Sequence, residues 1–130
     1  MASDIVLIVD DCKVDRVMVR STVERMLPDS QIVEADSPGE AVRLVEQHKP
    51  RLIIADVCYL HAAIKSLADG YELCQWIKGK IPDVVVVLVT GSFAAVSTEC
   101  AERCGADAFE IKSSSMQELA RALEPLLQKR

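Results

Sequence analysis

Apolar residues along the chain come in short continuous runs, separated by segments with helical spacing. The runs at residues 5–9, 52–55 and 84–89 are rich in β-branched residues and are apolar throughout. Such runs are typical of parallel strands that are covered on both faces. The run at 84–89 is the most apolar, which predicts that it is the central strand. Two further strands are predicted at 31–35 and 107–111.

Helical patterns fall between these runs, at residues 15–27, 37–48, 71–78, 93–104 and 115–128. The sequence Ser37-Pro38-Gly39-Glu40 has the form of a capping box with proline at the first helical position. Ser115 and Glu118 are spaced as a second capping box. Gly105 is a natural left-handed cap for the fourth helix. Pro125 is expected to bend or shorten the last helix.

This alternation of five strands and five helices predicts an α/β domain with one parallel sheet and helices on both faces. With no linker, tandem repeat or low-complexity segment, residues 1–130 are expected to form a single domain. No apolar run approaches the roughly 20 residues that cross a bilayer, and the amino-terminal segment lacks the basic stretch of a signal peptide. A soluble, cytoplasmic protein that does not associate with a membrane is therefore expected.

Charge and cysteine content bear on whether the protein binds nucleic acid, forms disulfides or binds a metal through cysteine. The net charge of −5 argues against direct nucleic-acid binding, which needs a clustered basic face. The five cysteines are an odd number and form no CxxC pair, so they are interpreted as reduced thiols. Cys100 and Cys104, four apart on a predicted helix, are expected to pack rather than to bind a metal.

The informative polar residues directly follow the strands. Asp10 and Asp11 follow the first, Asp56 the third, Thr90 the fourth and Lys112 the fifth. Ligands of open α/β sheets bind at the carboxyl ends of the strands. If the strand order is 2-1-3-4-5, the first and third strands are neighbours and their three carboxylates converge. A hard divalent cation such as Mg²⁺ would relieve the repulsion between them.

Such a pocket suits phosphoryl transfer. One carboxylate would act as the nucleophile and form an acyl phosphate, while the metal and an ammonium group share the charge of the phosphoryl oxygens. A hydroxyl from Thr90 could bind the phosphoryl group only when it is present, which can drive a conformational switch. Each residue also has a plainer interpretation. Asp10 and Asp11 could be turn residues or helix caps, Thr90 could be part of an ordinary turn, and Lys112 could be an exposed lysine.

The sequence resembles the receiver domains of two-component response regulators, the CheY-like family, over nearly the whole chain. The matching motifs are the acidic pair after the first strand, the acid after the third, Asp-Gly before the third helix, Thr-Gly after the fourth strand, and the run at residues 105–112. The positions that correspond to family motifs are Asp10, Asp11, Asp56, Asp69, Gly70, Thr90, Gly91, Phe109 and Lys112.

The resemblance implies a flavodoxin-like fold with strand order 2-1-3-4-5. It also implies that Asp56 is the phosphoacceptor and that Lys112 and Thr90 contact the phosphate. Thr90 and Phe109 would be switch residues, although an aromatic in a strand is more often simply part of the core. The implied ligands of Mg²⁺ are the side chains of Asp10, Asp11 and Asp56 and the backbone carbonyl of Cys58.

The chain departs from the family pattern at two places. Asp56 and Asp69 are thirteen positions apart with no proline between them, and residues 59–68 have helical spacing. This segment is expected either to cover Asp56 in part or to be a harmless longer loop. Ser113 follows Lys112 where the family has proline, which predicts a trans bond or a strained cis bond. His61 in the inserted segment is interpreted as a solvated residue rather than a metal ligand.

The leading hypothesis is a phosphorylation-activated switch rather than a dedicated enzyme. Its partners would be a sensor histidine kinase or histidine phosphotransfer protein and a downstream target, and it could dimerise on phosphorylation. The alternative is a phosphorylation-independent interaction scaffold. A haloacid-dehalogenase-type phosphatase is disfavoured because its Asp-x-Asp motif is missing after the first strand. A flavin-binding fold is disfavoured because no hydroxyl-rich phosphate loop follows that strand.

Overall fold

A computed structural model describes residues 4–56, 70–90, 104–111 and 116–128 of the chain. The named elements, in chain order, are β1 (Ile5–Val9), α1 (Lys13–Met26), β2 (Gln31–Ala35), α2 (Pro38–His48), β3 (Leu52–Asp56), α3 (Gly70–Lys80), β4 (Val85–Thr90), β5 (Ala108–Ile111) and α5 (Gln117–Gln128). None of the helices in the described ranges is long and apolar enough to cross a membrane.

The five strands form one parallel sheet in the order β2-β1-β3-β4-β5, which confirms the predicted topology. The expectation that the strand at 84–89 is central is wrong, because β3 occupies the middle of the sheet and β4 is next to it. Both strands have a neighbour on each side, and almost all their residues are buried. An apolar run therefore identifies a strand as interior but does not show which interior strand lies in the middle of the sheet.

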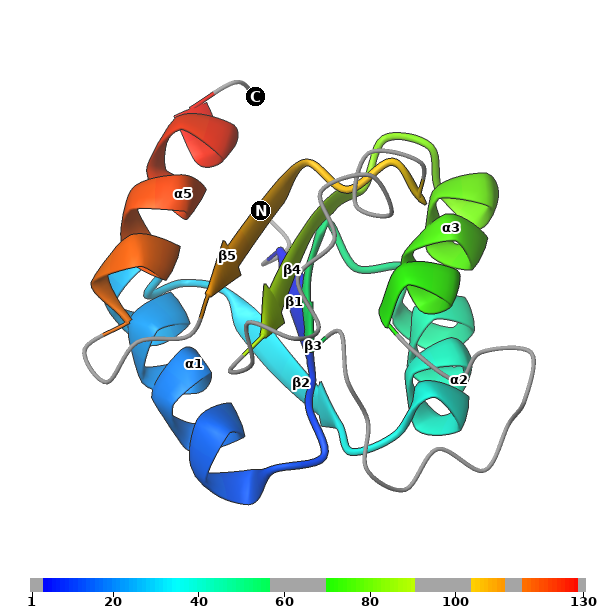
Figure 1. The fold of residues 1–130 in the computed structure, drawn as a ribbon, viewed down its shortest axis with the longest axis horizontal. Helices are drawn as coiled ribbons and strands as arrows, with labels where there is room; N and C mark the ends of the chain where they lie inside the picture. The colour runs from blue at the N-terminus through cyan, green and yellow to red at the C-terminus, as the bar shows by residue number, and fades with distance from the viewer. Residues whose placement is uncertain (1–3, 57–69, 91–103, 112–115, 129–130) are drawn as a thin grey trace.

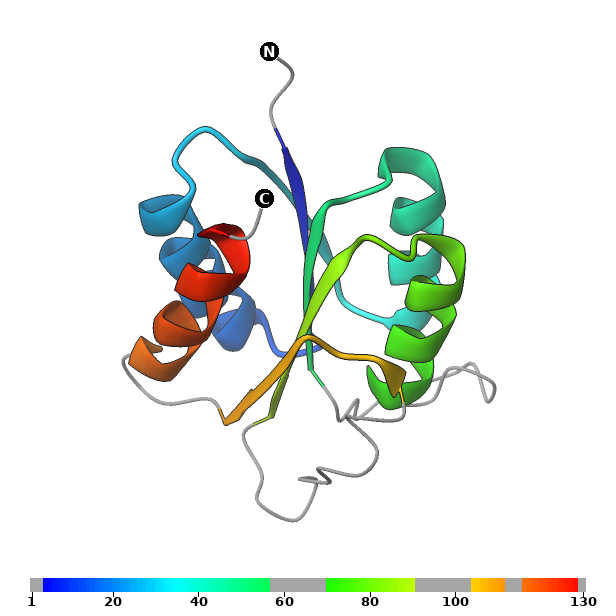
Figure 2. The same ribbon diagram turned by 90° about the horizontal axis from the view of Figure 1, so that it is seen from above.

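Helices cover both faces of the sheet, with α1 and α5 on one side and α2 and α3 on the other (Figures 1 and 2). Side chains of β1 alternate between the two cores, as the two-residue period of a strand requires. Val6 and Ile8 pack under α1 and α5, whereas Leu7 and Val9 pack under α2 and α3. Both faces of β1 are buried, which explains its uninterrupted apolar run.

The N-terminus of α2 has the predicted cap. Ser37 is the N-cap of α2, its Oγ accepts the Glu40 N–H at 3.2 Å, and Pro38 is the first helical residue. The carboxylate of Glu40 binds Arg43, one turn further along. Lys49 ends α2 in the left-handed region with φ 49°. The capping interaction of Ser37 is therefore confirmed.

The ends of α1 and α5 differ from prediction. Helix α1 begins at Lys13, two residues earlier than expected, with Cys12 as its N-cap. At α5 the Met116 carbonyl accepts the Ala120 N–H at 3.1 Å, so Met116 is the N-cap and not Ser115. A capping box at Ser115 would require the helix to begin one residue earlier. Pro125 lies inside α5, which continues to Gln128, so the proline does not end the helix.

The fourth predicted helix falls on residues 93–104, of which only Cys104 is described. Gly105 follows it with φ +85°, as predicted for a left-handed cap. Cys104 is buried and its carbonyl oxygen lies 3.5 Å from the Sγ of buried Cys74 on α3. This contact agrees with the interpretation of Cys104 as a packing residue. Burial is also the main cause that raises the pKa of the Cys74 thiol, so this thiol is protonated at neutral pH.

Candidate phosphoacceptor site

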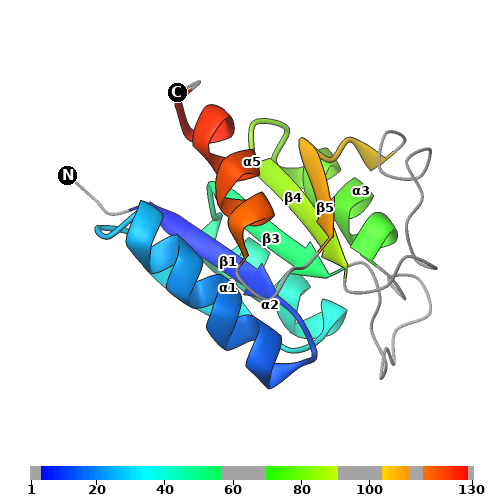
Figure 3. The same cartoon turned by 60° about the vertical axis from the view of Figure 1, so that its left-hand side comes forward.

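Asp10, Asp11 and Asp56 meet at the carboxyl ends of β1 and β3. The two strands are parallel neighbours with Val9 opposite Ala55, so the next residue of each strand is an aspartate at the same edge. Figure 3 shows the strands running toward this common edge. One carboxylate oxygen from each of the three residues lies within 4.8 Å of the others. The convergence predicted from the strand order is confirmed.

The three acids differ in exposure and in local bonding. Asp10 and Asp56 are 1% and 6% exposed, whereas Asp11 is half-buried. The Asp10 N–H donates to the Ala35 carbonyl at 3.0 Å, which extends the β1–β2 ladder by one residue. The Asp10 Oδ1 accepts the Cys12 N–H at 2.9 Å. Asp10 therefore makes a local turn bond, as the plainer interpretation suggested, but it is buried rather than solvated.

Like charges at this separation are costly in a buried site. Two ionised carboxylates about 5 Å apart repel by on the order of 3 kcal/mol at an effective dielectric constant near 20. Among the described residues, the cluster brings together three carboxylate groups, and Mg²⁺ and Ca²⁺ prefer such hard oxygen donors. Several carboxylates in one small space therefore fit a bound divalent cation better than they fit a structural role.

Thr90 and Phe109 lie on the two strands beyond β3. Thr90 is the last residue of β4 and is 1% exposed, one position beyond Val89, which pairs with Asp56. Its backbone thus ends at the same edge as the acids, as predicted. Phe109 pairs with Leu88 and is half-buried against the core under α2 and α3. This placement agrees with a core role and leaves its proposed switch role a prediction.

Several predicted site features lie outside the described residues. They are the ammonium of Lys112, the backbone carbonyl of Cys58, the inserted segment 59–68 with His61, the bond between Lys112 and Ser113, and Cys100. Their sequence positions stand as predictions. The described part of the site is therefore the acidic cluster together with Thr90.

The family model for the response regulator receiver domain matches residues 6–124, which include all five strands of the sheet except Ile5, the first residue of β1. The chain belongs to this family. Receiver domains are the phosphorylation-activated switches of two-component signalling. The match thus confirms the resemblance inferred from the strand-end residues.

Individual relatives agree with the assignment of a receiver domain. The chain is 31% identical over 127 residues to "Histidine kinase P4" of Formosa agariphila, covering 96% of this chain and 9% of the relative. It is 36% identical over 84 residues to "Transcriptional regulatory protein NatR" of Bacillus subtilis, covering 65% of this chain and 34% of the relative. This receiver domain therefore spans only about a tenth and a third of these two relatives.

A solved structure supports the fold independently. A CheY-like receiver domain protein from Methanospirillum hungatei superposes with a TM-score of 0.76 at 23% identity, over 98% of this chain and 96% of the other. This likeness shows that the five-stranded arrangement is the CheY-like fold.

One part of the site was not found by sequence reasoning: a buttress made by Arg16 of α1 and Glu34 of β2. Arg16 donates through Nη1 to the Asp10 carbonyl at 2.6 Å and through Nε to Glu34 Oε1 at 3.1 Å. Arg20 donates to the other oxygen of Glu34 at 2.6 Å. The spacing of the two arginines, four residues apart on a helix, places them on one face. Their contact with a strand residue follows only from the β1–β2 pairing.

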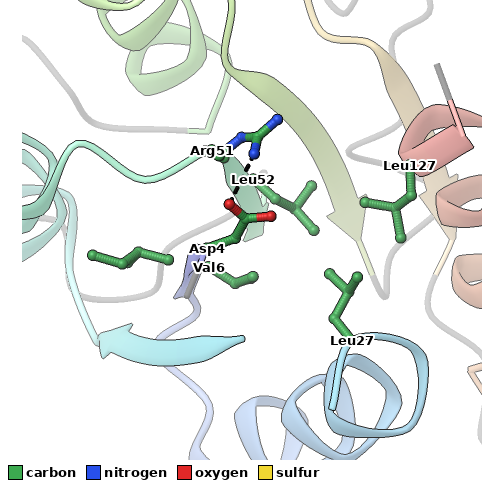
Figure 4. Close-up of a pocket in the computed structure, with 7 residues that line it drawn as sticks. Asp4, Val6, Leu27, Arg51, Leu52 and Leu127 are labelled. Atoms are coloured by element: carbon green, nitrogen blue, oxygen red, sulfur yellow. Dashed lines mark hydrogen bonds and ion pairs between the residues drawn. The ribbon is translucent and has the colours of Figure 1, made fainter. Parts of the chain in front are cut away.

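The receiver domain also has a small cavity at the opposite end of the sheet, close to the starts of β1 and β3 (Figure 4). Its volume is about 180 Å³. Asp4 and Arg51 form an ion pair of 2.8 Å at this cavity. The remaining lining is apolar and comes from Ile5, Val6, Leu27, Leu52 and Leu127. This end of the sheet therefore contains two opposite charges in contact.

Proposed function

We propose that this receiver domain accepts a phosphoryl group on Asp56 in a reaction that requires Mg²⁺. The donor would be a sensor histidine kinase or a histidine phosphotransfer protein. The observation that supports the proposal is the acidic cluster, in which three carboxylate oxygens lie within 4.8 Å and two of the side chains are buried. Among its members, Asp56 comes from β3, the central strand, and matches the phosphoacceptor position of the family.

In the proposed step, a carboxylate oxygen of Asp56 attacks the phosphorus atom of the donor. A new phosphorus–oxygen bond forms to Asp56, and the bond from phosphorus to the donor breaks, so its electron pair leaves with the donor. Asp10, Asp11 and Asp56, with the backbone carbonyl of Cys58, would hold the metal. When bound, Mg²⁺ would neutralise the clustered carboxylates and share the charge of the phosphoryl oxygens.

The remaining roles are proposed from the family resemblance. The Lys112 ammonium would pair with a phosphoryl oxygen, and the Thr90 hydroxyl would donate to another. Because the contact of Thr90 forms only in the phosphorylated state, it would favour a second conformation, with Phe109 following it. The position of Thr90 at the end of β4, at the same edge of the sheet as the acidic cluster, supports this role.

At the level of the cell, we propose a single receiver domain over residues 1–130 that acts in the cytoplasm as a signalling switch rather than as a dedicated enzyme. Its output would be binding to a downstream target protein, with phosphorylation-dependent dimerisation as a further possibility to test. The net charge of −5 supports a protein target rather than direct contact with nucleic acid or a membrane.

Acetyl phosphate supplies a direct test, with intact mass as the readout. We expect a single phosphoryl adduct on the parent chain with Mg²⁺, none with EDTA, and none for Asp56→Asn with Mg²⁺. Asp4→Asn is the matched control, because Asp4 is an acid at the other end of the same pair of strands and should leave the adduct unchanged. Failure of both acetyl phosphate and a histidine phosphotransfer donor would contradict the proposal and favour the scaffold alternative.

A further inference from the structure

We infer that Arg16, held by Glu34, is a positioning residue that sets the geometry of the acidic pair and thereby the affinity of the site for Mg²⁺. This inference rests on the proposed metal site. Arg16 binds the carbonyl of Asp10, which belongs to the peptide unit that joins Asp10 to Asp11. Fixing that peptide unit fixes the backbone directions from which both side chains leave.

The contacts of Arg16 are suited to this task. Its side chain is 17% exposed and lies between two acceptors, the Asp10 carbonyl at 2.6 Å and Glu34 Oε1 at 3.1 Å. Because the guanidinium group is planar, the hydrogen bond from Nε to Glu34 constrains the direction of the hydrogen bond from Nη1 to the Asp10 carbonyl. Bonds to charged groups contribute more than neutral ones, which favours a single arrangement.

Glu34 supplies the fixed end of the buttress. It lies on β2, where it is opposite Ile8 of β1, two residues before Asp10. Its second oxygen accepts Arg20 Nη1 at 2.6 Å, so the carboxylate is held from two sides by neighbouring turns of α1. The ladder bond from the Asp10 N–H to Ala35 then holds the other side of residue 10. The acidic pair is thus supported by β2 and α1 together.

Positioning and simple electrostatics predict opposite results for the removal of Arg16. A positive charge close to a cation site weakens cation binding, so loss of the charge alone would tighten Mg²⁺ binding. Loss of positioning would weaken binding, because outer partners that orient metal ligands typically contribute about 10- to 100-fold in metal affinity. The sign of the change therefore distinguishes the two effects.

Arg20 offers a matched control. Its bonded partner among the described residues is Glu34, and it carries the same charge on the same helix face as Arg16. It is 40% exposed at the side chain, and its bond to Glu34 is separate from the two bonds that Arg16 makes to Asp10 and to Glu34 Oε1. If positioning through the Asp10 carbonyl is the cause, Arg20→Met should change Mg²⁺ affinity little.

The test is Mg²⁺ titration by calorimetry on the full chain, with unfolding in EDTA measured in parallel to correct for stability. We expect Arg16→Met to bind Mg²⁺ about 10-fold more weakly than the parent. Arg16→Lys, which keeps the charge but not the fork, should fall between the two, and Arg20→Met should stay within about twofold of the parent. If Arg16→Met does not fold in EDTA, Arg16→Lys decides the test, with weaker binding expected.

Unchanged or tighter binding by the Arg16 variants would overturn the inference, as would an equal loss in Arg20→Met. Either result would leave the proposed function intact, provided that the parent binds Mg²⁺ and takes up phosphate. Absence of Mg²⁺ binding by the parent would instead overturn the proposed metal site and the inference with it. The parent titration thus separates the two failures.

Discussion

The two ends of β1 and β3 contain charged residues in opposite arrangements. At the amino ends, Asp4 and Arg51 precede the strands as an ion pair of 2.8 Å, with side chains 44% and 52% exposed. At the carboxyl ends, Asp10, Asp11 and Asp56 bring like charges within 4.8 Å, and Asp10 and Asp56 are buried. The same pair of strands therefore positions an ion pair at one end and a cluster of three carboxylates at the other.

This difference separates a structural arrangement from a functional one. An exposed ion pair contributes about 0–1 kcal/mol and needs no ligand. Buried carboxylates close together repel one another unless a positive charge offsets them, so this cluster is better suited to binding a cation than to stabilising the fold. The cavity beside Asp4 is mostly apolar, whereas the acidic end has the donor set of a hard cation.

The largest expected effect on stability is at the acidic end. Asp10→Asn removes one of the buried like charges and keeps an oxygen that can accept the Cys12 N–H. In EDTA we expect the free energy of unfolding to rise by on the order of 1–3 kcal/mol, because repulsion is relieved. The added stability that Mg²⁺ gives to the parent should be largely lost in the variant. Urea unfolding with and without Mg²⁺ measures both quantities.

A decrease in the stability of Asp10→Asn in EDTA would show that the carboxylate is net stabilising there, which contradicts the account of the acidic end. Asp10→Ala is a useful companion, because it also removes the acceptor for Cys12. Its gain should be smaller than that of Asp10→Asn by about 1 kcal/mol.

At the amino end a smaller effect of opposite sign is expected. Asp4→Asn breaks the ion pair with Arg51 and should lower the free energy of unfolding by less than about 1 kcal/mol, with or without Mg²⁺. The loss should shrink further in high salt, since the pair is exposed. Arg51→Met should give a comparable loss. A loss of several kcal/mol in the free energy of unfolding, or a loss that depends on Mg²⁺, would contradict the proposed difference between the two ends.

The smallest effect concerns Glu110 on β5, which pairs with Val89 beside the acidic end. Burial, and next the charge of Glu118, raise the pKa of the Glu110 carboxyl above its usual value of 4.5. The folded state then holds this proton more tightly than the unfolded state, so the contribution of Glu110 to stability falls as pH rises from 4.5 through the folded pKa. Glu110→Gln should remove that fall.

The measurement is urea unfolding of parent and Glu110→Gln in EDTA between pH 4 and 7. We expect the variant to gain on the parent as pH rises, with the difference levelling off above the folded pKa of Glu110. Glu118→Gln should reproduce part of the gain, because it removes the weaker of the two causes. A pH-independent difference between Glu110→Gln and the parent would show that the carboxyl titrates alike in both states.

Much of the fold and the acidic cluster could be predicted from the sequence because each depends on a local pattern. The buried strands were continuous apolar runs, and the acids directly followed two of them. Once the strand order was assumed, the convergence of Asp10, Asp11 and Asp56 followed from parallel topology. The Ser37 cap was likewise predictable, since all its contacts lie within one turn.

What could not be predicted depends on relations between elements. The run at 84–89 looked central, yet β3 and β4 are both interior and buried, and only the strand pairing shows which of them lies in the middle. The bond from Arg16 to Glu34 joins residues eighteen positions apart, and neither residue has a local signal that reveals the other. The contact can be identified only once the position of α1 relative to β2 is known.

The most direct test of the central claim is the chemical location of the phosphoryl group. After incubation with acetyl phosphate and Mg²⁺, borohydride reduction converts an aspartyl phosphate to homoserine, which peptide mass spectrometry can locate. The account predicts reduction at Asp56, dependent on Mg²⁺, with Asp4, Asp10 and Asp11 unmodified. Reduction at Asp10 or Asp11 would contradict the assignment of roles within the cluster, and a stable phosphoryl group on a serine or threonine would contradict the proposed chemistry.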